Sequence, residues 1–143
     1  MVFVETTDSS GAFNRLFDYI SGDNSNDQKI PMTAPVFMYF NEKDVEVMAF
    51  VMPADMSFGE TPKPDNSSVD VKLTEDSRFA TFKYFGCNND SMEQDGINKL
   101  KDWLATSSYV YDKNQQATYA GYSAPFIPCM LRHNEVMFRL TVQ

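Results

Sequence analysis

One stretch near the start of the chain, residues 10–37, most constrains the fold. It reads as an amphipathic helix, a polar turn and an extended segment, in that order. Five apolar residues recur at helical spacing and are expected to share one face of the helix: Ala12, Phe13, Leu16, Phe17 and Ile20. Ser9 or Ser10 is expected to cap the start of the helix, and Gly22 its end, where a left-handed residue is needed. Two prolines then exclude helix and hold the chain extended.

Three motifs of this chain occur together in one known family. The first is residues 19–22, Tyr-Ile-Ser-Gly, and the second is residues 29–36, Lys-Ile-Pro-Met-Thr-Ala-Pro-Val. The third lies near the end, where residues 121–125, Gly-Tyr-Ser-Ala-Pro, precede residues 131–136, Leu-Arg-His-Asn-Glu-Val. In this order they resemble the SOUL heme-binding family. The resemblance covers nearly the whole chain, from about residue 13 onward.

The remaining pattern predicts an α+β fold in a single SOUL-like domain, residues 1–143. A second helix is expected from residue 92 to residue 105, opened by a capping box at Ser91 and Gln94. Seven strands are expected at residues 2–7, 36–40, 45–52, 69–73, 79–85, 117–122 and 135–142. The resemblance implies an antiparallel β-barrel flanked by the two helices. The order of elements divides it into two similar strand-helix-strand-strand halves.

Comparison of the two halves predicts a gap at the N-terminal end. The second half has an extra strand, residues 69–73, ahead of residues 79–85, whereas no strand precedes Val2. The N-terminal strand of the family is therefore expected to be missing. Residues 2–7 would then have one bare edge, which invites either a covering loop or pairing in an edge-strand homodimer.

Composition restricts the partners and the compartment. The net charge of −8 argues against nucleic acid and against anionic membrane surfaces, because both need a basic footprint. No run of 18 apolar residues is present, so no membrane insertion is expected. No secretory or organellar signal is visible, which favours a cytoplasmic protein. Cys87 and Cys129 stand far apart and are expected to be reduced thiols in that compartment.

No catalytic or metal-binding signature is found in the sequence. The chain has one histidine, no Gly-x-Ser-x-Gly and no phosphate loop, so no catalytic residue and no metal ligand is predicted. His133 precedes the last predicted strand, and the family does not require imidazole at this position. A strong bond from His133 to heme iron is therefore not expected.

The family resemblance implies binding of heme or related tetrapyrroles in an apolar surface groove at the first helix, for heme buffering or transport and without catalysis. The predicted cofactor-binding residues are Phe13, Arg15, Leu16, Phe17, Lys29, Met32 and Met38. Apolar side chains would cover the porphyrin face, and the two cations would meet the propionates. One alternative is a protein-interaction or other apolar-ligand-binding module for which heme is incidental. A tetrapyrrole-modifying enzyme is the other.

Overall fold

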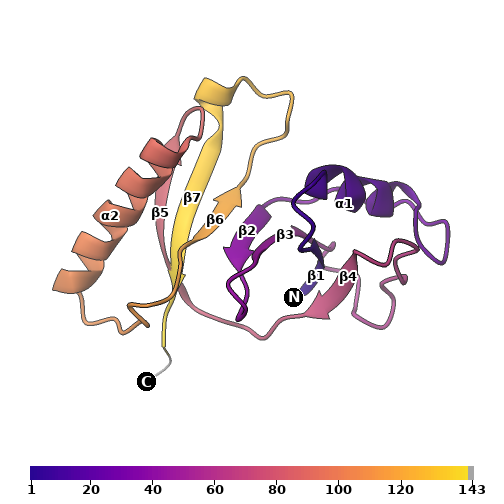
Figure 1. The fold of residues 1–143 in the computed structure, drawn as a ribbon, viewed down its shortest axis with the longest axis horizontal. Coiled ribbons are helices and arrows are strands. Elements are labelled where there is room, and N and C mark those ends of the chain that lie inside the picture. The colour runs from indigo at the N-terminus through magenta and orange to yellow at the C-terminus, as the bar shows by residue number, and fades with distance from the viewer. Residues whose placement is uncertain (142–143) are drawn as a thin grey trace. The chain divides into compact units, whose positions relative to one another are not determined.

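The computed structural model describes residues 1–141 and shows an α+β fold with two α-helices and seven β-strands (Figure 1). The chain divides into two compact units, Met1–Asp76 and Ser77–Gln143. The first unit contains β1 (Val2–Thr6), α1 (Ala12–Ser21), β2 (Val36–Phe40), β3 (Glu46–Val51) and β4 (Asp70–Leu73). The second contains β5 (Phe79–Phe85), α2 (Asp90–Thr106), β6 (Thr118–Gly121), the short 3-10 helix η1 (Cys129–Leu131) and β7 (His133–Arg139).

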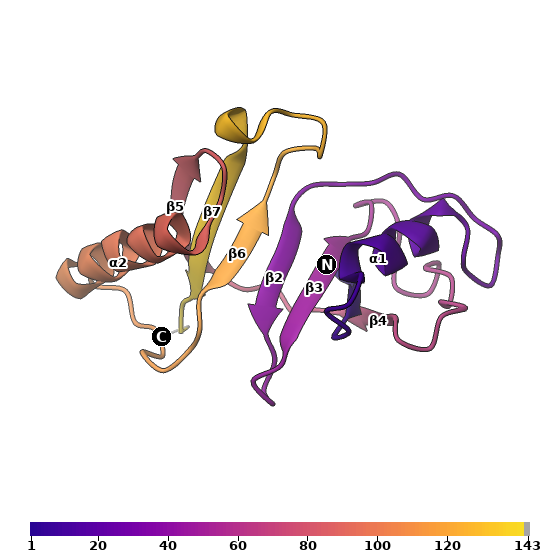
Figure 2. The same cartoon turned by 45° about the horizontal axis from the view of Figure 1, so that its top comes forward.

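The two units share one strand pattern. The first has the order β4-β1-β3-β2 and the second has the order β6-β7-β5, and all pairings within them are antiparallel. Figure 2 shows β2 and β3 running in opposite directions as neighbours. Each unit contains a strand-helix-strand-strand set whose first strand pairs with its last: β1 with β3 in the first unit and β5 with β7 in the second. The two predicted halves are therefore built alike. Neither set of strands closes on itself, and the predicted barrel is not confirmed.

Strand β1 has no bare edge. One side of β1 pairs with β3, from Phe3 opposite Val51 onward, and the other side pairs with β4, where Val2 lies opposite Leu73. The predicted unpaired edge at residues 2–7 is therefore wrong. β4, which the sequence pattern placed with the second half, occupies the position predicted to be empty. This pairing removes the reason for expecting a homodimer through β1.

Helix α1 covers one face of the first sheet, against β1 and β3. Its buried side chains are Ala12, Leu16, Tyr19 and Ile20, which join Val4 and Phe50 in the core of this unit. Phe17 was predicted to share the buried face but is 46% exposed. At about 100° per residue, Leu16 lies between Tyr19 and Ile20, and Phe17 lies beyond Ile20 at the edge of this stripe. Tyr19 therefore takes the place predicted for Phe17.

Only the C-terminal end of α1 follows the prediction. Gly11, with φ of 74°, precedes the helix and no side chain caps it. Ser10 instead bonds to Asp8, whose Oδ1 accepts from both the Ser10 amide and its hydroxyl, so the predicted serine cap is wrong. Gly22 ends the helix with φ of 128°, and its N–H donates to the Tyr19 carbonyl. The glycine stop is confirmed, since few other residues adopt this conformation.

The polar loop after α1 is organised by one buried side chain. Asn24 is 1% exposed, although it lies in the polar turn that follows the helix. Its Nδ2 donates to the carbonyls of Tyr19 (2.9 Å) and Gln28 (2.8 Å). Its Oδ1 accepts from the amides of Asn26 (3.2 Å) and Gln28 (3.1 Å). Because these four hydrogen bonds satisfy its side-chain amide, Asn24 can be buried without leaving a polar atom unpaired. The same bonds hold the loop closed.

Replacing Tyr19 with phenylalanine is expected to lower the free energy of unfolding by about 1 kcal/mol. The Tyr19 hydroxyl donates to the Pro62 carbonyl at 2.6 Å and ties α1 to the loop before β4. The variant keeps the ring but leaves a carbonyl without its donor. Urea denaturation followed by circular dichroism measures the change. An unchanged midpoint would show that water replaces the hydroxyl at no cost.

Helix α2 covers the second sheet, along β5 and β7 (Figure 1). Leu100 and Leu104 pack on Ala80 and Phe138. Gly96 permits the close approach, because a Cβ there would lie 3.2 Å from Val136 Cγ2. The cap is Asn89, whose side chain accepts from the Met92 amide, so the predicted box at Ser91 and Gln94 is wrong. Within residues 1–141 neither helix is long and apolar enough to cross a membrane.

Two further features of the second unit differ from prediction. Cys87 and Cys129 form a disulfide with a Cα–Cα distance of 4.4 Å, so the expectation of reduced thiols is wrong. The linear separation of 42 residues hid this proximity, which the pairing of β5 with β7 creates. The last strand ends at Arg139, before the predicted end. Val142, the predicted last residue of this strand, lies outside the described residues.

Candidate functional site

A stacked aromatic pair lies on α1. The rings of Phe13 and Phe17 are 6.1 Å apart with an interplanar angle of 12°. Phe13 is half-buried and meets Phe50 of β3 edge to face, with a centroid distance of 5.3 Å. Phe17 lies one turn further along and keeps nearly half of its surface exposed. Phe13 and Phe17, the α1 aromatic pair, thus present an apolar surface to solvent that the sheet supports from below.

The other predicted apolar contacts are distributed differently. Leu16 is completely buried in the core of the first unit, against which Phe13 packs. Met32 is 40% exposed. Met38 lines a separate small cavity of about 80 Å³ with Ala12 and Met48. Of the predicted apolar residues, the structure therefore brings Phe13 and Phe17 together, buries Leu16 in the core and places Met38 at another cavity.

The Arg15 side chain already has two partners within the first unit. Its guanidinium forms an ion pair with Asp8 at 2.9 Å and donates to the Ser10 carbonyl. The hydrogen bonds from Ser10, with a smaller contribution from the Arg15 charge, hold the pKa of Asp8 below its usual value. Arg15 is therefore engaged in holding the turn before α1, and a propionate would have to replace Asp8 to reach it.

Lys29 is exposed on the segment that follows the polar loop. This segment is fixed at two points: the Ile30 amide donates to the Ile20 carbonyl at 2.7 Å, and the Thr33 hydroxyl donates to the Val51 carbonyl. Lys29 forms no ion pair with any residue in the described part of the chain. Of the two predicted propionate partners, Lys29 is thus the one with an uncommitted charge.

His133 is held by its neighbours in the second unit. Its ring stacks on Tyr122 at 4.5 Å and 11° and meets Phe85 at 5.7 Å. Its Nε2 lies 3.0 Å from Glu135 Oε1. Burial, together with Glu135, raises the pKa of Tyr122 to about 12, so the phenol stays neutral. An iron bond at Nε2 would require the contact with Glu135 to break.

A buried carboxylate on the first sheet was not singled out by its sequence. Glu5 of β1 is 4% exposed, accepts a hydrogen bond from the Tyr39 hydroxyl and pairs with Lys72 Nζ at 2.5 Å. Burial and the contact with Glu5 raise the pKa of Tyr39 well above its usual value. Alternation along β1 places Glu5 on the face opposite Val2 and Val4, so the strand pattern did not indicate its burial. Its partners come from β2 and β4 and depend on strand order.

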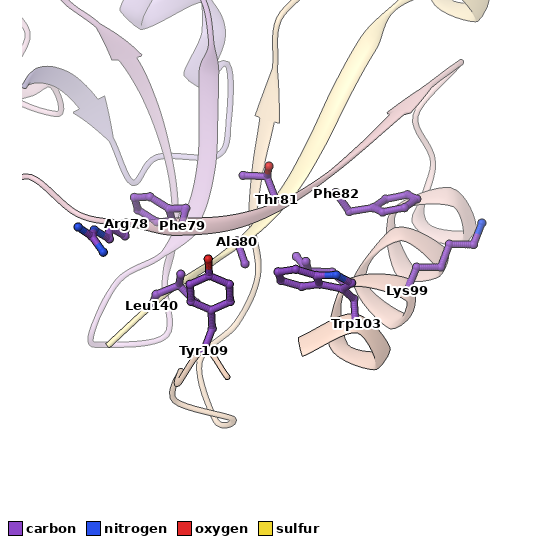
Figure 3. Close-up of a pocket in the computed structure, with 10 residues that line it drawn as sticks. Arg78, Phe79, Ala80, Thr81, Phe82, Lys99, Trp103, Tyr109 and Leu140 are labelled. Carbon is purple, nitrogen blue, oxygen red and sulfur yellow. The ribbon is translucent and has the colours of Figure 1, made fainter. Parts of the chain in front are cut away.

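A cavity with a volume of about 670 Å³ lies in the second unit, between α2 and β5 (Figure 3). We call it the α2 cavity. Its lining consists of Arg78, Phe79, Ala80, Thr81, Phe82, Lys99, Leu100, Trp103, Tyr109 and Leu140. No local sequence pattern indicates this cavity, because its lining residues come from four separate segments. The one available signal was Trp103, a large aromatic residue beside the apolar stripe of α2.

Two curated proteins are similar in sequence to this chain. Heme-binding protein 2 from Homo sapiens is 28% identical over 131 residues, which cover 87% of this chain and 62% of that protein. Heme-binding protein 2 from Mus musculus is also 28% identical, over 132 residues with the same coverages. The chain thus spans about three fifths of the length of these curated relatives.

Solved structures share the fold at low sequence identity. A crystal structure titled as a hydrolase from Listeria innocua has a TM-score of 0.69 at 12% identity, covering 99% of this chain and 87% of that one. An uncharacterized conserved protein from the same organism has a TM-score of 0.65 at 11% identity, covering 99% of this chain and 88% of the other. These likenesses concern the fold alone.

The sequence model of the SOUL heme-binding protein family matches residues 2–139 of this chain. The chain therefore belongs to that family.

Proposed function

We propose that this protein binds heme or a related tetrapyrrole on the α1 aromatic pair, as a carrier or buffer and not as a catalyst. Membership of the SOUL family and the names of the relatives support the ligand class. The observation that carries the site is the exposed Phe17 ring, stacked on Phe13, which in turn rests on Phe50. A flat apolar surface already in place is what a porphyrin face needs.

Apolar contact dominates the proposed binding energy. Burying one porphyrin face contributes roughly 5 kcal/mol before ordering costs, at about 25 cal/mol per Å² over a few hundred Å². One charge-assisted hydrogen bond to a propionate adds about 1 to 2 kcal/mol. Lys29 supplies this bond more readily than Arg15, because Arg15 already pairs with Asp8. The exposed Met32 adds polarisable surface on the segment that follows Lys29.

The test is a pair of titrations of micromolar protein, one with hemin and one with iron-free protoporphyrin. Hemin is expected to give a saturable one-to-one shift of the Soret band. Protoporphyrin is expected to bind within about threefold of hemin, because face burial and not an iron bond supplies the energy. The absence of a saturable Soret shift would remove the heme proposal. Binding of hemin alone would show that iron ligation holds it.

The two alternatives predict different results in the same experiments. An enzyme that modifies tetrapyrroles would convert bound heme during incubation, for example to metal-free porphyrin, whose fluorescence reports it. An interaction module would leave heme unbound or bound without saturation. The ion pair of Arg15 with Asp8 removes one of the two predicted propionate cations, which supports the interaction module more than the enzyme.

A further inference from the structure

We propose that the α2 cavity is a second ligand-binding site, which takes a flat aromatic anion. The cavity lies entirely within the second unit, between α2 and the outer strand β5. Its volume of about 670 Å³ falls in the range of small-molecule sites, which is about 300–1,000 Å³. No residue of the α1 aromatic pair lines it. The proposal therefore stands whether or not the protein binds heme.

The walls favour a flat ring. Trp103 and Tyr109 stack on each other at 5.8 Å and 28°, and both rings are about half exposed. In Figure 3 the two rings lie between Phe79 on one side and Phe82 on the other. Rings exposed at this level hold a planar ligand by stacking and by apolar burial together. An aliphatic ligand would gain only the burial.

The charge at the cavity favours an anion. Arg78 and Lys99 lie at opposite ends of it (Figure 3). Lys99 already pairs with Asp95 at 2.9 Å and lies over the Phe82 ring. Arg78 is exposed and has no ion pair with the residues that the structure describes. In a chain with a net charge of −8, an uncommitted guanidinium beside aromatic walls is a local site for a carboxylate or sulfonate.

The backbone of β5 adds further donors. The Leu140 amide donates to the Arg78 carbonyl, and the Gly86 amide donates to the Arg132 carbonyl, so the even-numbered residues of β5 bond to β7. In an antiparallel pair the intervening residues direct their N–H groups to the opposite side. The amides of Phe79 and Thr81 therefore point from the outer edge of β5, where both residues line the cavity. The carbonyls of these residues point the same way, so the edge offers hydrogen bonds to a ligand, and the preference for an anion rests on Arg78.

The test uses the one tryptophan of the chain as the reporter, because Trp103 is part of the wall. The probe is 8-anilinonaphthalene-1-sulfonate, and its uncharged twin N-phenyl-1-naphthylamine is the matched control. Selective excitation of tryptophan is expected to give saturable energy transfer to both probes. The sulfonate is expected to bind more tightly than the neutral probe, and added salt is expected to reduce this advantage.

Two variants then separate charge from stacking. Arg78→Gln is expected to weaken sulfonate binding about fivefold and to leave the neutral probe within about twofold. Tyr109→Ala is expected to weaken both probes. Lys113→Gln, which removes an exposed charge outside the cavity, and Phe17→Ala are expected to change neither. The proposal is overturned if neither probe saturates the Trp103 signal, or if Arg78→Gln and Lys113→Gln have equal effects.

Discussion

Replacing Phe17 with alanine is expected to weaken hemin binding about thirtyfold. Phe17 is 46% exposed, so the ligand has about half of the ring left to bury, which contributes about 1 kcal/mol. Stacking of the ring on the porphyrin adds about another 1 kcal/mol. Together these terms correspond to about thirtyfold in the dissociation constant. Titration at the Soret band measures the change.

Two control variants make this result specific. Phe40→Ala removes an equally exposed ring, at 42%, from the far end of β2 and is expected to leave hemin affinity unchanged. His133→Ala is expected to preserve the Soret maximum, because the imidazole is stacked on Tyr122 and contacts Glu135. Loss of a low-spin spectrum in His133→Ala would show that the iron is ligated by histidine and that the proposed site is misplaced.

Removing the disulfide is expected to lower the free energy of unfolding by about 4 kcal/mol. The bond between Cys87 and Cys129 closes a loop with a sequence separation of 42, which restricts the unfolded chain by about this amount in the chain-entropy account. The double variant Cys87→Ser/Cys129→Ser should show the full loss in urea denaturation. The wild-type protein should lose the same amount on addition of a reductant.

The reductant also supplies the control, because it should not affect the double variant. Arg132, just beyond the disulfide-closed loop, also holds the end of that loop, because its guanidinium donates to the carbonyls of Ile127 and Pro125 at 2.9 and 2.7 Å. The loop is therefore expected to keep its native contacts in the double variant at low denaturant. Labelling of two free thiols in the native wild-type protein would contradict the disulfide.

Strand positions followed well from the sequence, because alternation and β-branched residues are local signals. β2 and β5 have the predicted bounds, and β1 and β3 differ from prediction by only one residue at each changed end. Strand partners were harder to predict. β4 is adjacent to β5 in the sequence but pairs with β1, and nothing local in residues 69–73 records that partner. Order in a sheet depends on contacts across the whole unit.

Side-chain roles on the helices were predicted less well. Helical spacing alone could not show that Tyr19 is buried and Phe17 is not. Burial of Tyr19 depends on the Pro62 carbonyl, which accepts a hydrogen bond from the Tyr19 hydroxyl. Burial raises the pKa of Tyr19 to about 12, which keeps this donor in place at neutral pH. The burial of Asn24 likewise could not be predicted from the polar sequence around it. Its partners are backbone groups that come together only after the loop has folded.

The candidate site could be predicted only in part from the sequence. The family motifs led to α1, and the structure supports an aromatic surface there through the stacking of Phe13 on Phe17. The engagement of Arg15 by Asp8 was missed, because a helix residue and a preceding turn residue meet through side chains alone. The α2 cavity was missed because its lining depends on how α2 lies over β5.

The outer position of β5 has a consequence for solubility. A seven-residue strand with free amides and an aromatic residue at each end could recruit strands from other molecules and start aggregation. Lys83 stands in the interior of this strand, with its ammonium 5.1 Å from the centre of the Phe85 ring. An added strand would have to strip water from that charge. Lys83 thus acts as a gatekeeper that keeps the exposed edge from self-assembly.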